Sequence, residues 1–122
     1  MVLLVGGLAA CSSTPSAKKD AAIIDVTNNA QTVTGIYDPN TFSSDDMRDI
    51  AKHICGTDTI GSLAQQSEEG FTRFSVNCGA VSRYGKHVGA TFYRQGPNAV
   101  KGYITHADSS GNLAQSQVNL NT

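Results

Sequence analysis

Three cysteines are the residues with the clearest chemistry in this chain of 122 residues. Cys55 and Cys78 each fall on the apolar side of an element that the hydrophobic pattern predicts. Thiols on two apolar faces point into one core, and in an oxidising compartment they can join as a disulfide. The residues leave open a second interpretation, in which both thiols stay reduced and only pack. Cys11 would leave an odd thiol in an exported protein unless it is modified.

A helix over about 44–55 is predicted to position Cys55. Ser43 suits the N-cap, and Asp46 follows three residues later, as in a capping box. Gly56 stands where a left-handed residue ends many helices. The apolar residues between these signals recur at helical spacing: Met47, Ile50, Ala51, Ile54 and Cys55. This period predicts one buried stripe that includes the thiol.

A strand ending at Cys78 is predicted from alternation. The inward positions would be Thr72, Phe74, Val76 and Cys78, and the outward ones Arg73, Ser75 and Asn77. A period of two is typical of a half-buried strand. Cys78 therefore shares the core face with the two apolar side chains before it.

The start of the chain carries a processing signal. Leu8-Ala9-Ala10-Cys11 ends a short, uncharged apolar run that fits a signal peptide and is too short to span a bilayer. It resembles the lipobox of bacterial lipoproteins, in which cleavage precedes a cysteine that carries diacylglycerol and a further acyl chain. The resemblance implies a signal peptide at 1–10, a lipidated Cys11 and, through Ser12, sorting to the outer membrane with the domain facing the periplasm. One departure is that no Lys or Arg precedes the apolar run.

The rest of the chain fits one small domain. Residues 11–32 are mostly small and polar and predict a flexible tether, in which 23–26 could form a short strand or docking segment. Residues 33–122 predict a single α+β domain, with the helix packed on an antiparallel sheet of about four or five strands and stapled by the disulfide. The candidate strands are 33–37, 60–66, 71–78, 87–94, 99–107 and 113–120.

Charge is unevenly distributed along the chain. Acidic residues dominate 20–69, whereas 71–107 carries only basic ones, and His87 and His106 can add charge at lower pH. A candidate anion-binding surface follows: Arg73, Lys86, Arg94 and Lys101. The alternative is an ordinary solvated face balanced by the acidic helix. The basic residues are sparse for a nucleic-acid binder, and we expect none to be bound.

No residue pattern favours catalysis. His53 and Cys55 are two positions apart on a helix and do not face each other. A pair between Cys55 and His87 would be abolished by the disulfide. Acidic residues at the helix start are explained by the helix dipole, and no metal-ligand spacing such as CxxC or HxxxH occurs. We therefore expect neither an enzyme nor a cofactor or metal.

A second, looser resemblance covers about a quarter of the chain. Ile50-Ala-Lys-His-Ile-Cys55, Ile60-Gly-Ser-Leu63 and Phe71-Thr-Arg-Phe-Ser-Val-Asn-Cys78 are similar to a helix-Cys and strand-Cys arrangement in small uncharacterised proteobacterial lipoproteins. It implies a disulfide-linked α+β domain but gives no information about activity. We expect a membrane-anchored binding or scaffolding module for another envelope protein, reached through an exposed sheet edge. The alternative is a binder of anionic envelope polymer or lipid phosphates.

Overall fold

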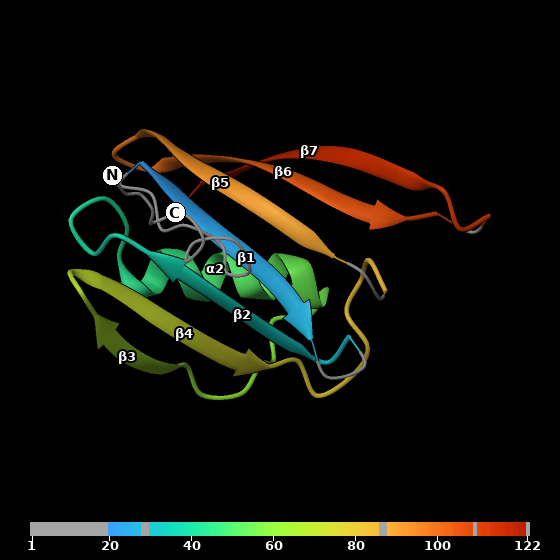
Figure 1. Ribbon diagram of the computed structural model, residues 1–122, viewed down its shortest axis with the longest axis horizontal. Helices are drawn as coiled ribbons and strands as arrows, with labels where there is room; N and C mark the ends of the chain where they lie inside the picture. The colour runs from blue at the N-terminus through green and yellow to red at the C-terminus, as the bar shows by residue number, and fades with distance from the viewer. Residues whose placement is uncertain (1–19, 28–29, 86–87, 109, 122) are drawn as a thin grey trace, which may run out of the picture.

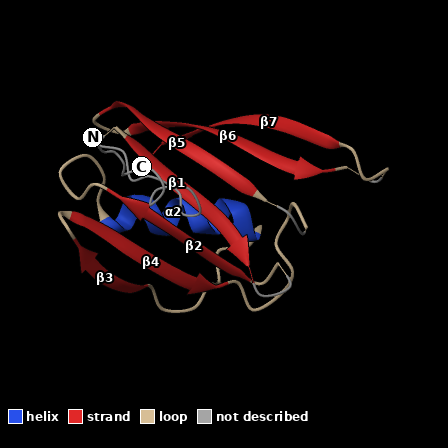
Figure 2. Cartoon of the chain, in the orientation of Figure 1, coloured by secondary structure: helices blue, strands red, loops and turns tan. Residues whose placement is uncertain are grey.

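A computed structural model describes residues 20–27, 30–85, 88–108 and 110–121. They form one seven-stranded antiparallel sheet with the helix α2 (Ser44–Cys55) against one face (Figures 1 and 2). The strands are β1 (Ala21–Thr27), β2 (Thr32–Tyr37), β3 (Ala64–Glu68), β4 (Phe71–Asn77), β5 (Gly89–Gly96), β6 (Ala99–Ala107) and β7 (Leu113–Asn121). Their order across the sheet is β3-β4-β2-β1-β5-β6-β7. We call the face against α2 the inner face and the opposite one the outer face.

The predicted class, a helix on an antiparallel sheet, is confirmed, but the sheet has more strands than the four or five expected. The main addition is β1, which lies inside the range predicted as tether and pairs with β2 on one side and β5 on the other. Its inward residues Ala22, Ile24 and Val26 are buried. The sheet therefore begins at Ala21, and β3 also starts later than the predicted 60–66. The predicted signal peptide 1–10 and Cys11 lie outside the described residues.

The helix has the predicted bounds, because both of its ends are specified locally. The Ser43 hydroxyl accepts from the Asp46 backbone N–H at 3.1 Å, and the Asp46 carboxylate accepts from the Ser43 N–H at 2.8 Å. Gly56 ends the helix in the left-handed conformation, with φ of 79°. The predicted apolar stripe is buried and faces the sheet.

Phe92 of β5 occupies the centre of the inner face and is fully buried. Its register partner on β6 is Gly102, and a Cβ atom there would come within 2.3 Å of the Phe92 ring. No ordinary side chain fits so close to a buried ring. Gly102 thus lets the aromatic ring lie flat on β6 beneath the helix.

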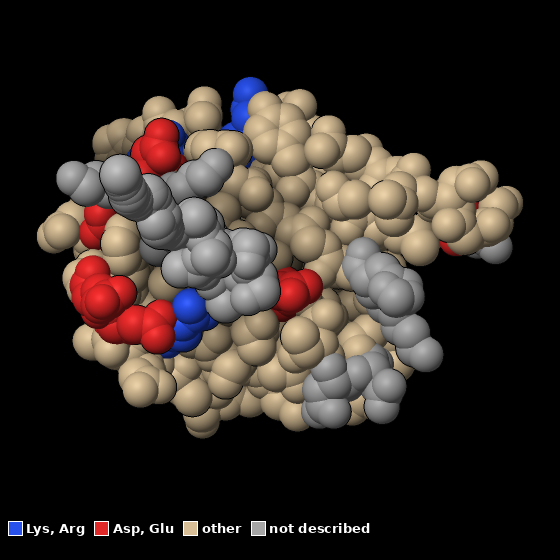
Figure 3. Space-filling view, viewed as in Figure 1, with Lys and Arg blue, Asp and Glu red and all other residues tan. Residues whose placement is uncertain are grey.

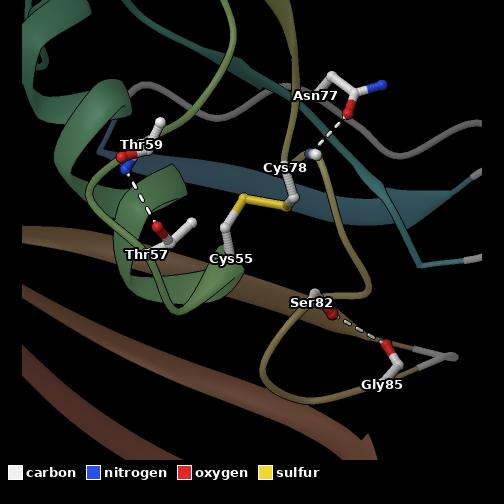
Figure 4. Close-up of a disulfide and its surroundings, with 8 residues drawn as sticks. Cys55, Thr57, Thr59, Asn77, Cys78, Ser82 and Gly85 are labelled. Atoms are coloured by element: carbon white, nitrogen blue, oxygen red, sulfur yellow. Dashed lines mark hydrogen bonds between the residues drawn. A yellow bond between two sulfur atoms is a disulfide. The ribbon is translucent and has the colours of Figure 1, made fainter.

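The predicted disulfide between Cys55 and Cys78 is present (Figure 4), with 5.3 Å between the Cα atoms. It joins the last residue of α2 to the residue after β4 and closes a loop with a sequence separation of 23. In the chain-entropy account, a loop of this length adds roughly 3 kcal/mol of stability. The Arg83 N–H also donates to the Ile54 carbonyl at 2.9 Å, so a second link holds the same end of the helix.

Candidate functional site

Of the four basic residues predicted as an anion-binding surface, the three that the structure describes, Arg73, Arg94 and Lys101, do not lie together. Arg73 lies on the outer face of β4 and pairs with Glu68 of β3. Lys101 lies on the outer face of β6, with three strands between β6 and β4. Four strand spacings place these two backbones roughly 19 Å apart. Lys86 falls outside the described residues, as does His87. Figure 3 shows the outer face, on which the Lys and Arg side chains appear at separate places.

Arg94 points to the inner face and holds the start of the helix. Its guanidinium pairs with the Asp46 carboxylate, donates to the Thr41 carbonyl at 3.1 Å and lies 5.3 Å from the Phe42 ring centroid. The Arg94 side chain is 20% exposed and that of Asp46 9%. This charge is therefore balanced inside the fold. The sequence did carry a signal for this placement: Arg94 is two residues after Phe92 in β5, so the two side chains lie on the same face of the strand.

A polar cluster that the sequence did not predict bridges the helix and the last two strands. The His53 Nε2 atom lies 2.8 Å from the Tyr84 hydroxyl, and the Tyr84 ring centroid lies 5.1 Å from that of His106. His106 in turn contacts the Ser116 hydroxyl of β7 at 3.0 Å. The sequence carries no signal for this cluster, because its residues meet only through pairing of distant strands.

The cluster is better explained as a bridge than as a reactive centre. Burial lowers the pKa of His53, and the nearby Arg83 guanidinium lowers it further. The imidazole is therefore neutral at neutral pH and can share a proton with the Tyr84 hydroxyl. No three His, Cys, Asp or Glu residues within the described ranges gather as metal ligands. The contacts tie β6 and β7 to the helix end.

The outer face has two shallow hollows, one on each side of β1. One of about 410 Å³ lies over β2 and β4, and one of about 550 Å³ lies over β5 and β6. Ile23 and Asp25 line both of them. Neither hollow gathers a reactive group beyond the ion-paired Arg73 and the carboxylate of Asp25, so neither indicates a specific chemistry.

Among the described residues, the β7 edge of the sheet has the longest row of backbone groups without a neighbouring strand. All nine residues of β7 pair with β6 in continuous register, and no described strand lies on its other side. The strand has no charged residue and no proline. The β6–β7 hairpin projects from the body of the molecule, and Leu113 at its tip is 73% exposed (Figures 1 and 3).

The opposite edge differs. β3 has five residues, all exposed, and it ends at Glu68, which is followed by Glu69 in the turn. Short length and charge are the usual means of keeping an edge strand from pairing. β7 lacks both. It is therefore the described surface best suited to receive another strand.

Comparisons with protein-family models, curated proteins and solved structures found no match. Within the described ranges, no helix has the length and apolar character needed to cross a bilayer.

The pairing of Arg94 with Asp46 predicts a large difference between two neighbouring aspartates. Asp46→Ala removes both a helix cap and the partner of a half-buried cation, so we expect a loss of about 3 kcal/mol in the free energy of unfolding. Asp45→Ala is the matched control, because its 3.1 Å pair with Arg48 is exposed and should be worth less than about 0.5 kcal/mol. Urea denaturation of the full chain measures both, and equal losses would contradict the assignment.

The lowered pKa of His53 predicts a pH dependence of stability. The unfolded chain binds a proton on this histidine near pH 6.5, whereas the folded chain binds it only at lower pH. The neutral His53 ring therefore contributes its full share of the folding stability above about pH 6.5. This share is lost as the pH falls through the pKa of His53 in the folded chain. Denaturation between about pH 7.5 and 5.5 should show a decline that His53→Gln makes shallower. Titration of the His53 ring by NMR at or above its ordinary value would refute this.

Proposed function

We propose that this protein is a binding or scaffolding module of the bacterial envelope that receives an extended strand of its partner along β7. The observation that carries the proposal is the nine-residue, uncharged edge. Every second residue of such an edge turns its N–H and C=O groups outward, where a new strand can bind them. Each hydrogen bond gained contributes about 1 kcal/mol net.

The side chains of β7 provide specificity on two faces. Gln115, Gln117 and Asn119 are exposed on the outer face and offer amide donors and acceptors. Val118 and Leu120 are only half-buried on the inner face and pack against the edge of the core. A partner strand with the same alternation would cover these two apolar side chains. This combination of backbone pairing and alternating side-chain contacts is the usual form of strand addition.

The proposed location is the periplasmic side of the outer membrane, held by lipid on Cys11. Its support is the resemblance of Leu8-Ala9-Ala10-Cys11 to a lipobox, together with the disulfide, which favours an oxidising compartment. Lipidation of Cys11 would also account for the third, odd cysteine. Binding of an anionic polymer is less well supported, because Arg94 is committed to Asp46, and Arg73 and Lys101 lie far apart.

The anchor is tested with the full chain in a Gram-negative host. We expect mature material to start at a Cys11 whose mass includes acyl chains, and Cys11→Ser to remove the protein from the membrane fraction. Cys55→Ser is the control, because the lost disulfide should leave the anchor in place. An intact, unmodified leader in the native protein would overturn the proposal of a lipoprotein.

The β7 interface is tested by photo-crosslinking in intact cells. A photoreactive residue replaces Gln115, Gln117 or Asn119 in turn, and Gln66 of β3 serves as an exposed control on the other edge. We expect a discrete product, with another protein or with a second copy, from the β7 positions and not from Gln66. Equal products from both edges, or no product from β7, would refute the proposed function.

A further inference from the structure

We infer that the strand received by β7 is β7 of a second copy of this chain, paired antiparallel about a two-fold axis that passes between the two copies of Gln117. This inference rests on the proposed function and names its partner. The pairing would join two seven-stranded sheets edge to edge into one continuous sheet.

The register of β7 favours an axis at Gln117. A two-fold axis perpendicular to the sheet pairs residues equally far from its centre, and residues that face each other across antiparallel strands point to the same side. Gln117 is the middle residue of β7, so an axis there pairs all nine residues. Each inner-face residue then lies opposite an inner-face residue of the second copy. An axis two residues away would leave residues at both ends unpaired. Both copies of α2 then lie on the same side of the joined sheet.

The side chains of the two copies match each other under this axis. On the outer face, Gln117 meets its own copy and Gln115 meets Asn119. A primary amide carries both donors and acceptors, so it pairs well with another amide, including an identical one. On the inner face, Leu120 meets Ala114 and Val118 meets Ser116, so each half-buried large side chain meets a small one.

The two copies of β7 do not repel each other electrostatically. Self-pairing across a two-fold axis places like residues close together, and like charges directly opposite each other destabilise a sheet. β7 has no charge. The nearest cation in register is Lys101, opposite Asn119 on β6. Two copies of Lys101 would be three strand spacings apart across the joined sheet, roughly 14 Å, and offset along the strands as well, so their separation exceeds the screening length of about 8 Å at physiological salt.

The contacts of the β6–β7 hairpin indicate that the edge keeps its shape. Its register runs from Ala107↔Leu113 to Ala99↔Asn121 without a bulge, and the His106–Ser116 contact fixes its inner face. Bulges and twists at edges commonly prevent pairing. A second β7 thus meets a continuous row of backbone groups.

The test is a cysteine at the proposed axis, in the full-length chain and in intact cells. Gln117→Cys brings two identical thiols opposite each other, at a Cα separation of about 4.5–5.5 Å, which lies within the range that a disulfide spans. We expect a reducible band of twice the mass on a non-reducing gel, with peptide mapping showing the 117–117 link and an intact Cys55–Cys78 bond.

The matched control uses the same strand and face. Gln115→Cys alone places its two thiols about four residues apart along the paired strands, roughly 13 Å, and should give no dimer. Gln115→Cys with Asn119→Cys restores opposition and should give the dimer again. Adding Gln117→Lys to this double variant sets two cations face to face and should lower the dimer yield several-fold, whereas Gln66→Lys on β3 should not.

Two results overturn the inference. One is a crosslink from Gln115→Cys as efficient as that from Gln117→Cys, which would indicate random collision. The other is a monomeric Gln117→Cys variant while the photoreactive residues on β7 capture a different protein. In that second case the proposed function stands and only the identity of the partner is wrong. Failure of β7 to give any product, with itself or with another protein, refutes both.

Discussion

A single helix has to cover one face of a seven-stranded sheet, and the rest of the structure follows from that mismatch in size. Twelve residues give a helix about 18 Å long and about 10 Å wide. Seven strands span about 29 Å. The helix can therefore bury only the central strands. Burial is complete at Ile24, Val33 and Phe92 and falls to half at Val118, while β3 is exposed throughout.

Both ends of the helix are fixed to the sheet by strong and different means. At the start, Asp46 caps the first turn and accepts the Arg94 guanidinium from β5. At the end, the disulfide joins Cys55 to Cys78 after β4. These links reach strands on opposite sides of the central pair β2 and β1. The helix is therefore held in one position across the sheet. The inner residues Val100 and Ile104 of β6 are still buried, whereas Val118 and Leu120 of β7 are only partly covered.

What could be predicted from the sequence is what local chemistry specifies. The helix bounds follow from Ser43 and Gly56, and the β6 range follows from turns on either side, because these signals lie within a few residues of the ends that they set. The disulfide was predictable because each thiol falls on an apolar face. The order of the strands depends on pairing between distant segments, for which neither capping nor alternation gives a signal.

The two main differences from expectation have the same origin. β1 follows a polar stretch and contains Asp25 and Thr27, so its composition resembles a tether, and only its position between β2 and β5 makes it central. The alternation in β5 places Arg94 on the same side as Phe92, but its partner Asp46 is identified only once β5 is placed beside the start of α2. The polar cluster of His53, Tyr84 and His106 was missed for the same reason.

The two edges of the sheet differ in a way that bears on function. The outer residues of β7 are exposed and make no demand on the core, so the fold leaves their identity open. A protein that had only to avoid aggregation could place lysine, glutamate or proline there, as β3 ends in acidic residues. The strand has instead mostly uncharged amides on its outer face, and Ala114, Ser116, Val118 and Leu120 on its inner face. These choices leave the backbone groups of the edge accessible and add side chains that can pair with their own kind, which is the property expected of a strand that works by receiving another.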